Sequence, residues 1–133
     1  MKAIILKGFG DVENLSIADL PIPEMSDNEV LVRVRAIGIN PIDIKTRKGK
    51  GIAGALKDLD PIILGWDISE IITRTGGKVT SFKKGDEVFG MINFPGHGKA
   101  YAEYVVAPET HLALKPKNVS HEEAAAASLA ALT

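Results

Sequence analysis

The chain of 133 residues contains no cysteine, which rules out disulfide bonds and metal sites built from thiolates. Its formal net charge is only −1, so no long-range field draws it to nucleic acid or to an anionic membrane surface. No apolar run is long enough to cross a bilayer, and the four apolar residues between Lys2 and Lys7 are too few for a signal peptide. These absences favour a cytoplasmic protein that is held together by its hydrophobic core.

Hydrophobic residues make up 45% of the chain and charged residues 25%, which is enough apolar surface for one domain with a packed core. Short runs rich in β-branched residues recur along the sequence, and glycine, proline and aspartate separate them. This spacing is typical of a mainly β protein, either a barrel or a sandwich. We expect strands at residues 3–7, 15–20, 30–39, 62–73, 87–92, 102–107 and 112–114.

The stretch VRAIGINPIDIKTRKG predicts a strand followed directly by a short capped helix. Apolar residues alternate with arginines up to Ala36, which is the period of a strand with one buried face. Asn40 precedes Pro41, so its backbone is expected to be extended and its side chain can cap a helix that begins at the proline. We expect this helix to run to about Lys48, with Gly49 as its stop.

A second helix is predicted at the end of the sequence. Ser120 followed by Glu123 is a capping-box signature, which places the helix start at His121. The residues that follow are small and apolar on nearly every face, so the helix needs cover on several sides. We therefore expect residues 1–119 to form the first domain of a longer protein and residues 120–133 to begin a second domain. A helix folded back on the barrel is the alternative.

Four segments stand in order along the chain: AIGINPIDIKTRKG, ILGWDISEI, SFKKGDEVFGM, and AYAEYVVAPETHLALKP followed by EEAAAASLAALT. Together they resemble the N-terminal half of the medium-chain dehydrogenases/reductases, and within them the zinc-independent quinone oxidoreductases related to zeta-crystallin. The resemblance implies a mainly β fold, a GroES-like β-barrel with short helices. Its C-terminal helix would lead to a missing Rossmann domain that binds NADPH.

The resemblance also bears on metal binding. Zinc alcohol dehydrogenases of the same superfamily place a cysteine where Asn40 stands and a histidine where Trp66 stands, and neither asparagine nor tryptophan is a usual zinc ligand. The histidines of the chain are scattered without ligand spacing. We therefore expect no zinc and no other metal in this part of the protein. One departure from the family is Glu70, which stands where glycine is usual, so the local backbone is expected to differ.

The resemblance implies a set of site residues. Asn40 is expected to lie near the nicotinamide and the substrate carbonyl, where its amide can donate a hydrogen bond, and Lys45 is expected to act with it in catalysis. Thr133 matches the family's threonine near the nicotinamide carboxamide. The residues expected to border the substrate cleft are Asp43, Trp66 and Phe94.

Each of these positions also has a structural interpretation. Asn40 is fully explained as a helix cap. Asp43 suits the first turn of a helix, with Arg47 four residues later as a surface partner. Lys45 can be a solvated lysine whose stem lies along apolar surface. Asp67 is expected to bond to nearby backbone donors.

The leading hypothesis is an NADPH-dependent reductase of quinones or α,β-unsaturated carbonyl compounds, which transfers hydride without zinc and is a homodimer when full length. Relatives that reduce activated alkenes often carry lysine at position 45, so Lys45 shifts the expected substrate toward enones and enals. The fragment alone is expected to be inactive, because it lacks the glycine-rich βαβ phosphate site.

Two alternatives remain open. The first is a free-standing GroES-like barrel that assembles as a co-chaperone or binding module through an apolar patch. The second is an RNA-associated protein that would use the basic run from Lys45 to Lys50 and bind in a salt-dependent way. Neither a membrane nor a specific nucleic acid is an expected partner of the leading hypothesis.

Overall fold

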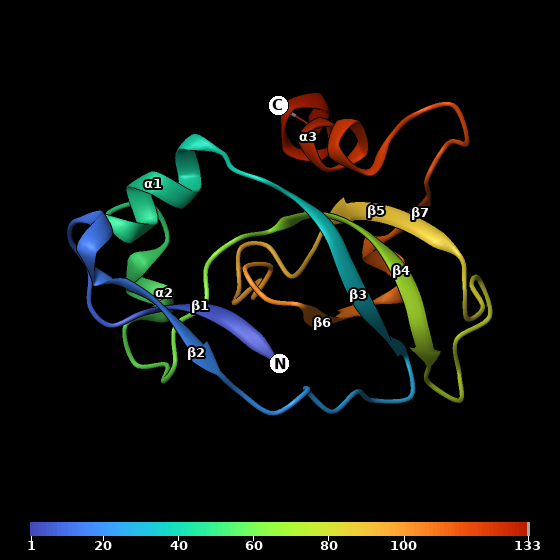
Figure 1. The fold of residues 1–133 in the computed structure, drawn as a ribbon, viewed down its shortest axis with the longest axis horizontal. Helices are drawn as coiled ribbons and strands as arrows, with labels where there is room; N and C mark the ends of the chain where they lie inside the picture. Colours follow the sequence, from blue (N-terminus) through green and yellow to red (C-terminus); the bar gives the residue numbers. More distant parts are fainter. Residues whose placement is uncertain (133) are drawn as a thin grey trace.

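The computed structural model describes residues 1–132 and consists mainly of antiparallel strands with short helices (Figure 1). The predicted mainly β architecture is confirmed. The elements in chain order are β1 (Lys2–Leu6), η1 (Val12–Asn14), β2 (Leu15–Asp19), β3 (Glu29–Gly38), α1 (Pro41–Arg47), α2 (Ala53–Leu56), β4 (Asp67–Thr75), β5 (Glu87–Met91), β6 (Tyr104–Pro108), η2 (Glu109–His111), β7 (Ala113–Leu114) and α3 (His121–Leu132).

Two sheets build the molecule. One is the hairpin of β1 and β2, and the other has five antiparallel strands in the order β6-β3-β4-β5-β7. The hairpin lies beside α1 and α2, while α3 crosses the outside of the larger sheet (Figure 1). Apolar side chains of β3, β4, β5 and β6 and of the segment between β5 and β6 form the core of the barrel: Val30, Val32, Ile68, Ile72, Val88, Ile92, Ala100, Val105 and Ala107.

Two predicted strands start later in the structure, and one short helix was not predicted. The expected strand over residues 62–73 begins only at Asp67, because Gly65 has a left-handed backbone (φ +94°) that interrupts it. A Cβ at Gly65 would lie 2.5 Å from the ring of Tyr101, so only glycine fits. The expected strand over residues 102–107 begins two residues later, at Tyr104. Helix α2 was not predicted, since a four-residue helix leaves no apolar periodicity.

Helix α1 forms where the sequence predicts it. Asn40 is its N-cap residue with an extended backbone, Pro41 is its first residue, and Gly49 follows the end of the helix with φ +86°. The expected pairing of Arg47 with Asp43 is wrong. The Arg47 guanidinium instead donates to the carbonyl oxygen of Gly10, since the carboxylate is turned toward the buried side of the helix.

Helix α3 begins with the predicted capping box. The Ser120 N–H donates to Glu123 Oε2 at 2.9 Å, and the Glu123 N–H donates to Ser120 Oγ at 3.1 Å. The helix packs on β3, β4 and β5 through Ala124, Ala125 and Ser128, which are buried. One face of the helix is therefore covered by the barrel, as in the alternative of a helix folded back on it, and the start of a second domain at residue 120 stays a prediction.

At Gly38 the backbones of β3 and α3 approach each other closely. A Cβ added at Gly38 would lie 2.5 Å from the carbonyl oxygen of Ala125 and 2.9 Å from Cβ of Asp67. Both distances are shorter than real carbon contacts allow, so glycine is what lets the helix lie so close to the strand.

Glu70 lies inside the barrel. It alternates along β4 with Ile68 and Ile72 and pairs in register with Val34 on β3 and Val88 on β5, so its side chain shares the face of the apolar core. The residue is 0% exposed, and neither carboxylate oxygen has a hydrogen-bond partner within residues 1–132. Burial raises the pKa of the Glu70 carboxyl group well above its usual value. The pairing of β4 with β3 is regular at Glu70. The nearest irregularity is in β3, where the register shifts between Val34 and Ala36.

Candidate active site

The junction between β3 and α1 places Asn40 beside Asp67. The Asn40 side-chain Nδ2 donates to Asp67 Oδ2 at 2.9 Å, across 27 residues of sequence. The second N–H of the amide has no partner among the residues that the structure describes. Asn40 is half-buried, so its amide has one N–H that is fixed and one that remains available to a ligand.

Asp43 is buried beneath the same junction and accepts two hydrogen bonds there. Its Oδ2 accepts the backbone N–H of Asn40 at 2.9 Å, and its Oδ1 accepts the hydroxyl of Tyr101 at 2.8 Å. Burial raises the pKa of Asp43, the hydrogen bonds from Asn40 and Tyr101 oppose this shift, and the charge of Asp67 adds to it. Burial and the nearby Asp43 also raise the pKa of the Tyr101 hydroxyl. Asp43 is 2% exposed, so it supports the junction and does not face an open cleft.

Asp67 connects the junction to helix α3. Besides the Asn40 amide, its Oδ2 accepts the backbone N–H of Leu129 at 3.0 Å. Burial raises the pKa of this carboxyl group, while the two donors lower it. Asp67 is 0% exposed and its Oδ1 has no partner within residues 1–132. We call Asn40, Asp43, Asp67 and Tyr101 the Asn40 cluster.

The rings of Trp66 and Phe94 lie together, and Trp66 directly precedes Asp67 in the chain. Their rings meet edge to face, with centroids 5.7 Å apart and an interplanar angle of 87°. Trp66 is 1% exposed and donates through Nε1 to the carbonyl oxygen of Gly96 at 2.8 Å, whereas Phe94 is 37% exposed. Phe94 can therefore border a cleft, and Trp66 supports it from within the core.

Lys45 is exposed on α1, and no hydrogen bond or ion pair joins its side chain to the described part of the chain. The structure does not bring it into the Asn40 cluster. Thr133 lies outside the described residues. Of the predicted site residues, the fold therefore joins Asn40 to Asp43 and Trp66 to Phe94.

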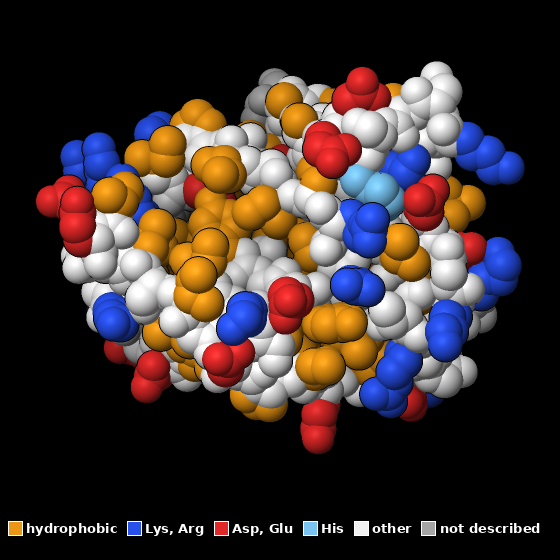
Figure 2. Space-filling view, viewed as in Figure 1, with side chains coloured by type: hydrophobic (Ala, Val, Ile, Leu, Met, Phe, Trp, Pro, Cys, Tyr) orange, Lys and Arg blue, Asp and Glu red, His pale blue; other side chains and the backbone are white. Residues whose placement is uncertain are grey.

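Two hollows flank the Asn40 cluster and the hairpin. Hydrophobic side chains gather over the part of the surface between α1, β1 and β3 (Figure 2). A groove of about 310 Å³ runs there, and Ile4, Ile17, Ile37 and Tyr101 are among the residues that line it. Because Tyr101 also bonds to Asp43, this apolar groove reaches the Asn40 cluster.

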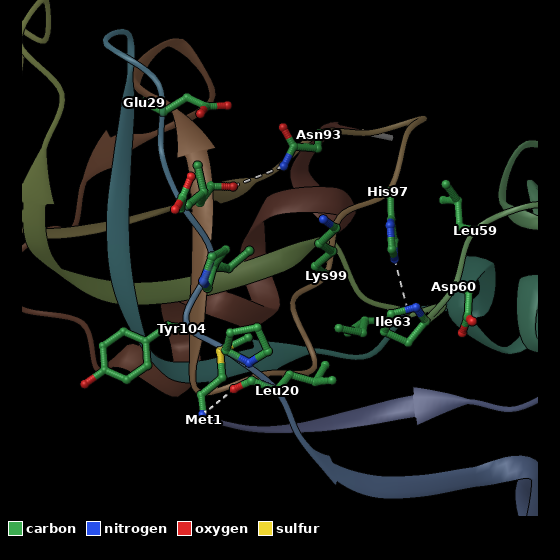
Figure 3. Close-up of a pocket in the computed structure, with 16 residues that line it drawn as sticks. Met1, Leu20, Glu29, Leu59, Asp60, Ile63, Asn93, His97, Lys99 and Tyr104 are labelled. Atoms are coloured by element: carbon green, nitrogen blue, oxygen red, sulfur yellow. Dashed lines mark hydrogen bonds between the residues drawn. The ribbon is translucent and has the colours of Figure 1, made fainter.

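A larger cavity of about 500 Å³ lies between the N-terminus, residues 20–24 and the loop of residues 93–99 (Figure 3). His97 lines it and accepts the backbone N–H of Ile63 through Nε2 at 2.9 Å. Burial, with the nearby Lys99, lowers the pKa of His97 to about 4. None of the site residues expected from the sequence lines this cavity.

Residues 1–132 contain neither a cluster of metal ligands nor a membrane-spanning helix. No group of three or more histidine, aspartate or glutamate side chains stands close enough to hold a metal ion, and the zinc-free site stays a prediction. No helix in the described range has the length and apolarity to cross a membrane.

The barrel with a capped helix after its long central strand defines a known class of domain. Residues 26–117 match the family of the alcohol dehydrogenase GroES-like domain, and the chain belongs to that family. This confirms the GroES-like barrel and the resemblance to medium-chain dehydrogenases/reductases.

Similar proteins include reductases and oxidoreductases. The chain is 35% identical to the 2-methylene-furan-3-one reductase of Solanum lycopersicum, over 98% of this chain and 34% of the relative. It is 34% identical to the chloroplastic NADPH-dependent alkenal/one oxidoreductase of Arabidopsis thaliana, over 98% of this chain and 35% of the relative. Among solved structures, the quinone oxidoreductase from Coxiella burnetii matches with a TM-score of 0.96 and 40% identity, over 100% of this chain and 42% of that chain. The chain thus spans about a third of the length of these curated relatives.

Sequence reasoning missed the part that Tyr101 and Asp67 have in the site. The sequence assigned no site role to Tyr101, and Asp67 was expected to bond to nearby backbone donors. The backbone donor exists, at Leu129, but the Asn40 amide is the second partner. A usable signal was the single carboxylate in the apolar run ILGWDI, since a charge in such a run needs specific partners.

Proposed function

We propose that this chain is the substrate-side part of an NADPH-dependent oxidoreductase that reduces quinones or α,β-unsaturated carbonyl compounds without zinc. The observation that carries the proposal is the Asn40 amide, which has one N–H bound to Asp67 and one without a partner in residues 1–132. The printed names of the relatives, a furanone reductase, an alkenal/one oxidoreductase and a quinone oxidoreductase, support the substrate class. They give no support to a free-standing co-chaperone or to an RNA-associated protein.

The chemistry calls for a hydrogen-bond donor at the substrate oxygen. When bound, NADPH supplies the hydride that adds to the electron-poor carbon of the acceptor. Negative charge develops on the carbonyl oxygen of the acceptor as its conjugated double bond is reduced. The free N–H of Asn40 can donate to this oxygen, and a preorganised donor of this kind contributes about 3 kcal/mol to the transition state. We propose Lys45 as a second donor, because its long exposed side chain can turn toward a bound acceptor.

The described residues can supply only a few of the contacts that NADPH needs. Residues 49–54 match the spacing G-x-G-x-x-G, but they follow helix α1 and lead into the four-residue helix α2. A dinucleotide fingerprint instead follows a strand and opens a long helix. Asn40 is therefore the described residue that we propose to contact the nicotinamide, and Thr133 is proposed from the resemblance alone. The homodimer and the cytoplasmic location of the full-length protein stay predictions.

The test is the oxidation of NADPH by the full-length protein, followed by absorbance with a quinone, an enal and a saturated ketone. We expect the first two to be reduced and the saturated ketone to be left, since hydride addition to a conjugated acceptor gives a delocalised anion, whereas addition to an isolated carbonyl group does not. Asn40→Ala should lower kcat/KM by roughly 100- to 1,000-fold, as expected when an oxyanion donor worth about 3 kcal/mol is lost. Lys45→Met should lower it less, and mainly for the enal.

Lys48→Met is the matched control for Lys45, because Lys48 is an equally exposed lysine at the C-cap of the same helix. Unchanged kcat/KM in the double variant of Asn40 and Lys45 would overturn the proposed roles of both residues. Reduction of the saturated ketone as fast as the enal would overturn the proposed substrate class.

A further inference from the structure

Asp67 joins two parts of the molecule through one oxygen atom. The amide of Asn40 donates to Asp67 Oδ2 at 2.9 Å, and the backbone N–H of Leu129 in α3 donates to the same oxygen at 3.0 Å. Asp67 itself is 0% exposed and stands at the first position of β4. A buried carboxylate oxygen that is shared in this way fixes each donor with respect to the other.

We propose that Asp67 is a positioning residue, which holds the Asn40 amide in one orientation and links that orientation to the place of helix α3. The inference rests on the proposed function, because it concerns the direction in which the free N–H of Asn40 is presented. Asp67 is too deeply buried to contact a substrate, so it acts through Asn40.

The orientation of an asparagine amide needs an external partner. The last side-chain torsion of asparagine is broad, so the rotamer alone does not fix the plane of the amide. A charged, buried acceptor forms a shorter and stronger hydrogen bond than a neutral one. Once one N–H is held by Asp67, the planar geometry of the amide sets the direction of the second N–H. A donor that is misdirected by about 1 Å can cost roughly 100-fold in rate, so this restraint matters for catalysis.

Helix α3 reaches the same junction by a second contact. The carbonyl oxygen of Ala125 lies against Gly38, two residues before Asn40, so closely that no Cβ fits between them. One turn later the Leu129 N–H meets Asp67. A displacement of α3 therefore moves both the strand end that carries Asn40 and the carboxylate that orients its amide. The position of the helix and the orientation of the amide are therefore coupled.

The matched control is Ser69, two residues further along β4. Ser69 Oγ and His121 Nδ1 form a hydrogen bond of 2.7 Å, which also ties β4 to α3 but does not involve Asn40. Ser69→Ala removes an attachment of the helix and leaves the Asn40 amide in place. It should keep kcat within about twofold of the wild-type value, as expected for a bond with no part in the reaction.

The experiment compares Asp67→Ala, Asp67→Asn and Ser69→Ala in the full-length protein. Asp67→Ala should lower kcat by roughly 10- to 100-fold with little change in KM, because binding of the substrate is kept and the transition-state donor is misdirected. Asp67→Asn keeps an oxygen acceptor without the charge, so it should retain an intermediate kcat, and it serves if the alanine variant does not fold. The double variant Asn40→Ala with Asp67→Ala should have the kcat of Asn40→Ala alone, since both changes act on one donor.

A spectroscopic readout separates this inference from the proposed function. The Asn40 side-chain proton that is bonded to Asp67 should resonate downfield in a nitrogen–proton correlation spectrum, move upfield in Asp67→Ala and stay in place in Ser69→Ala. Amide resonances and kcat that are both unchanged in Asp67→Ala would overturn the inference, and so would losses that multiply in the double variant. An upfield shift of that proton in Asp67→Ala with full activity of Asn40→Ala would leave Asp67 as the anchor of the amide and overturn the proposed catalytic role of Asn40 instead.

Discussion

Replacing Glu70 with methionine tests whether a buried carboxyl group in the barrel destabilises the protein. Methionine is unbranched and of similar length, so it can follow the path of the glutamate side chain among Ile68, Ile72 and Val88 without a new cavity. The substitution removes two oxygen atoms that have no hydrogen-bond partner in the described chain. A buried polar group without a partner costs about 1–3 kcal/mol, so the free energy of unfolding should rise by roughly that amount.

The gain should also depend on pH. Burial holds the pKa of Glu70 in the folded state well above 4.5, so the folded state binds the proton more tightly than the unfolded state does. The contribution of this group is fully present below about pH 4.5 and is lost as the pH rises through the raised pKa. The advantage of Glu70→Met over the wild type should therefore grow as the pH rises above 4.5.

Denaturant unfolding of the full-length protein at several pH values measures both effects. In thermal unfolding, a gain of 1–3 kcal/mol corresponds to about 4–12 °C in Tm for a domain of this size. Glu70→Gln is the control, because it keeps a buried polar group but cannot ionise; it should abolish the pH-dependent part and give little gain below pH 4.5. A lower free energy of unfolding for Glu70→Met at every pH would refute the reasoning, since it would mean that the carboxyl group has a favourable partner.

Three further changes test other contacts. Gly38→Ala should lower the free energy of unfolding by about 1–3 kcal/mol, because its Cβ would overlap the backbone of α3; a variant as stable as the wild type would show that the helix does not pack so closely. Tyr101→Phe should cost about 1–2 kcal/mol, since it leaves Oδ1 of Asp43 unpaired, whereas Tyr104→Phe should cost little, and equal losses would contradict the bond. Because the pKa of His97 is lowered to about 4, stability should fall as the pH drops from 6.5 toward 4. His97→Gln should remove that fall, and an NMR titration midpoint near 6.5 would show that the ring is not buried as described.

Local chemistry allowed the secondary structure around the site to be predicted. Asn40 before Pro41 is a strong start signal for a helix, and α1 begins there because the proline ring presets the helical φ. The pair Ser120 and Glu123 marked the start of α3 for a similar reason, since both capping bonds form within four residues. Such signals depend on neighbours in sequence, so one chain is enough to interpret them.

The contacts that complete the site could not be predicted in this way. Asn40 meets Asp67 across 27 residues, and Tyr101 meets Asp43 across 58. Which side chains meet at such separations is decided by strand register, and a one-residue shift in register turns a side chain to the opposite face of the sheet. The packing of α3 on the barrel could not be predicted for the same reason. It depends on a close approach of Ala125 to β3, which glycine at position 38 allows.

The contact of Gly38 with Ala125 has a consequence for how this domain tolerates sequence change. The gap between β3 and α3 is set by main-chain atoms, which every substitution on the exposed side of the helix leaves unaltered. Surface side chains can therefore diverge freely between related proteins while the spacing of the helix from the barrel stays constant. Gly38 thus fixes the distance between β3 and α3, because its backbone is in direct contact with the backbone of the helix.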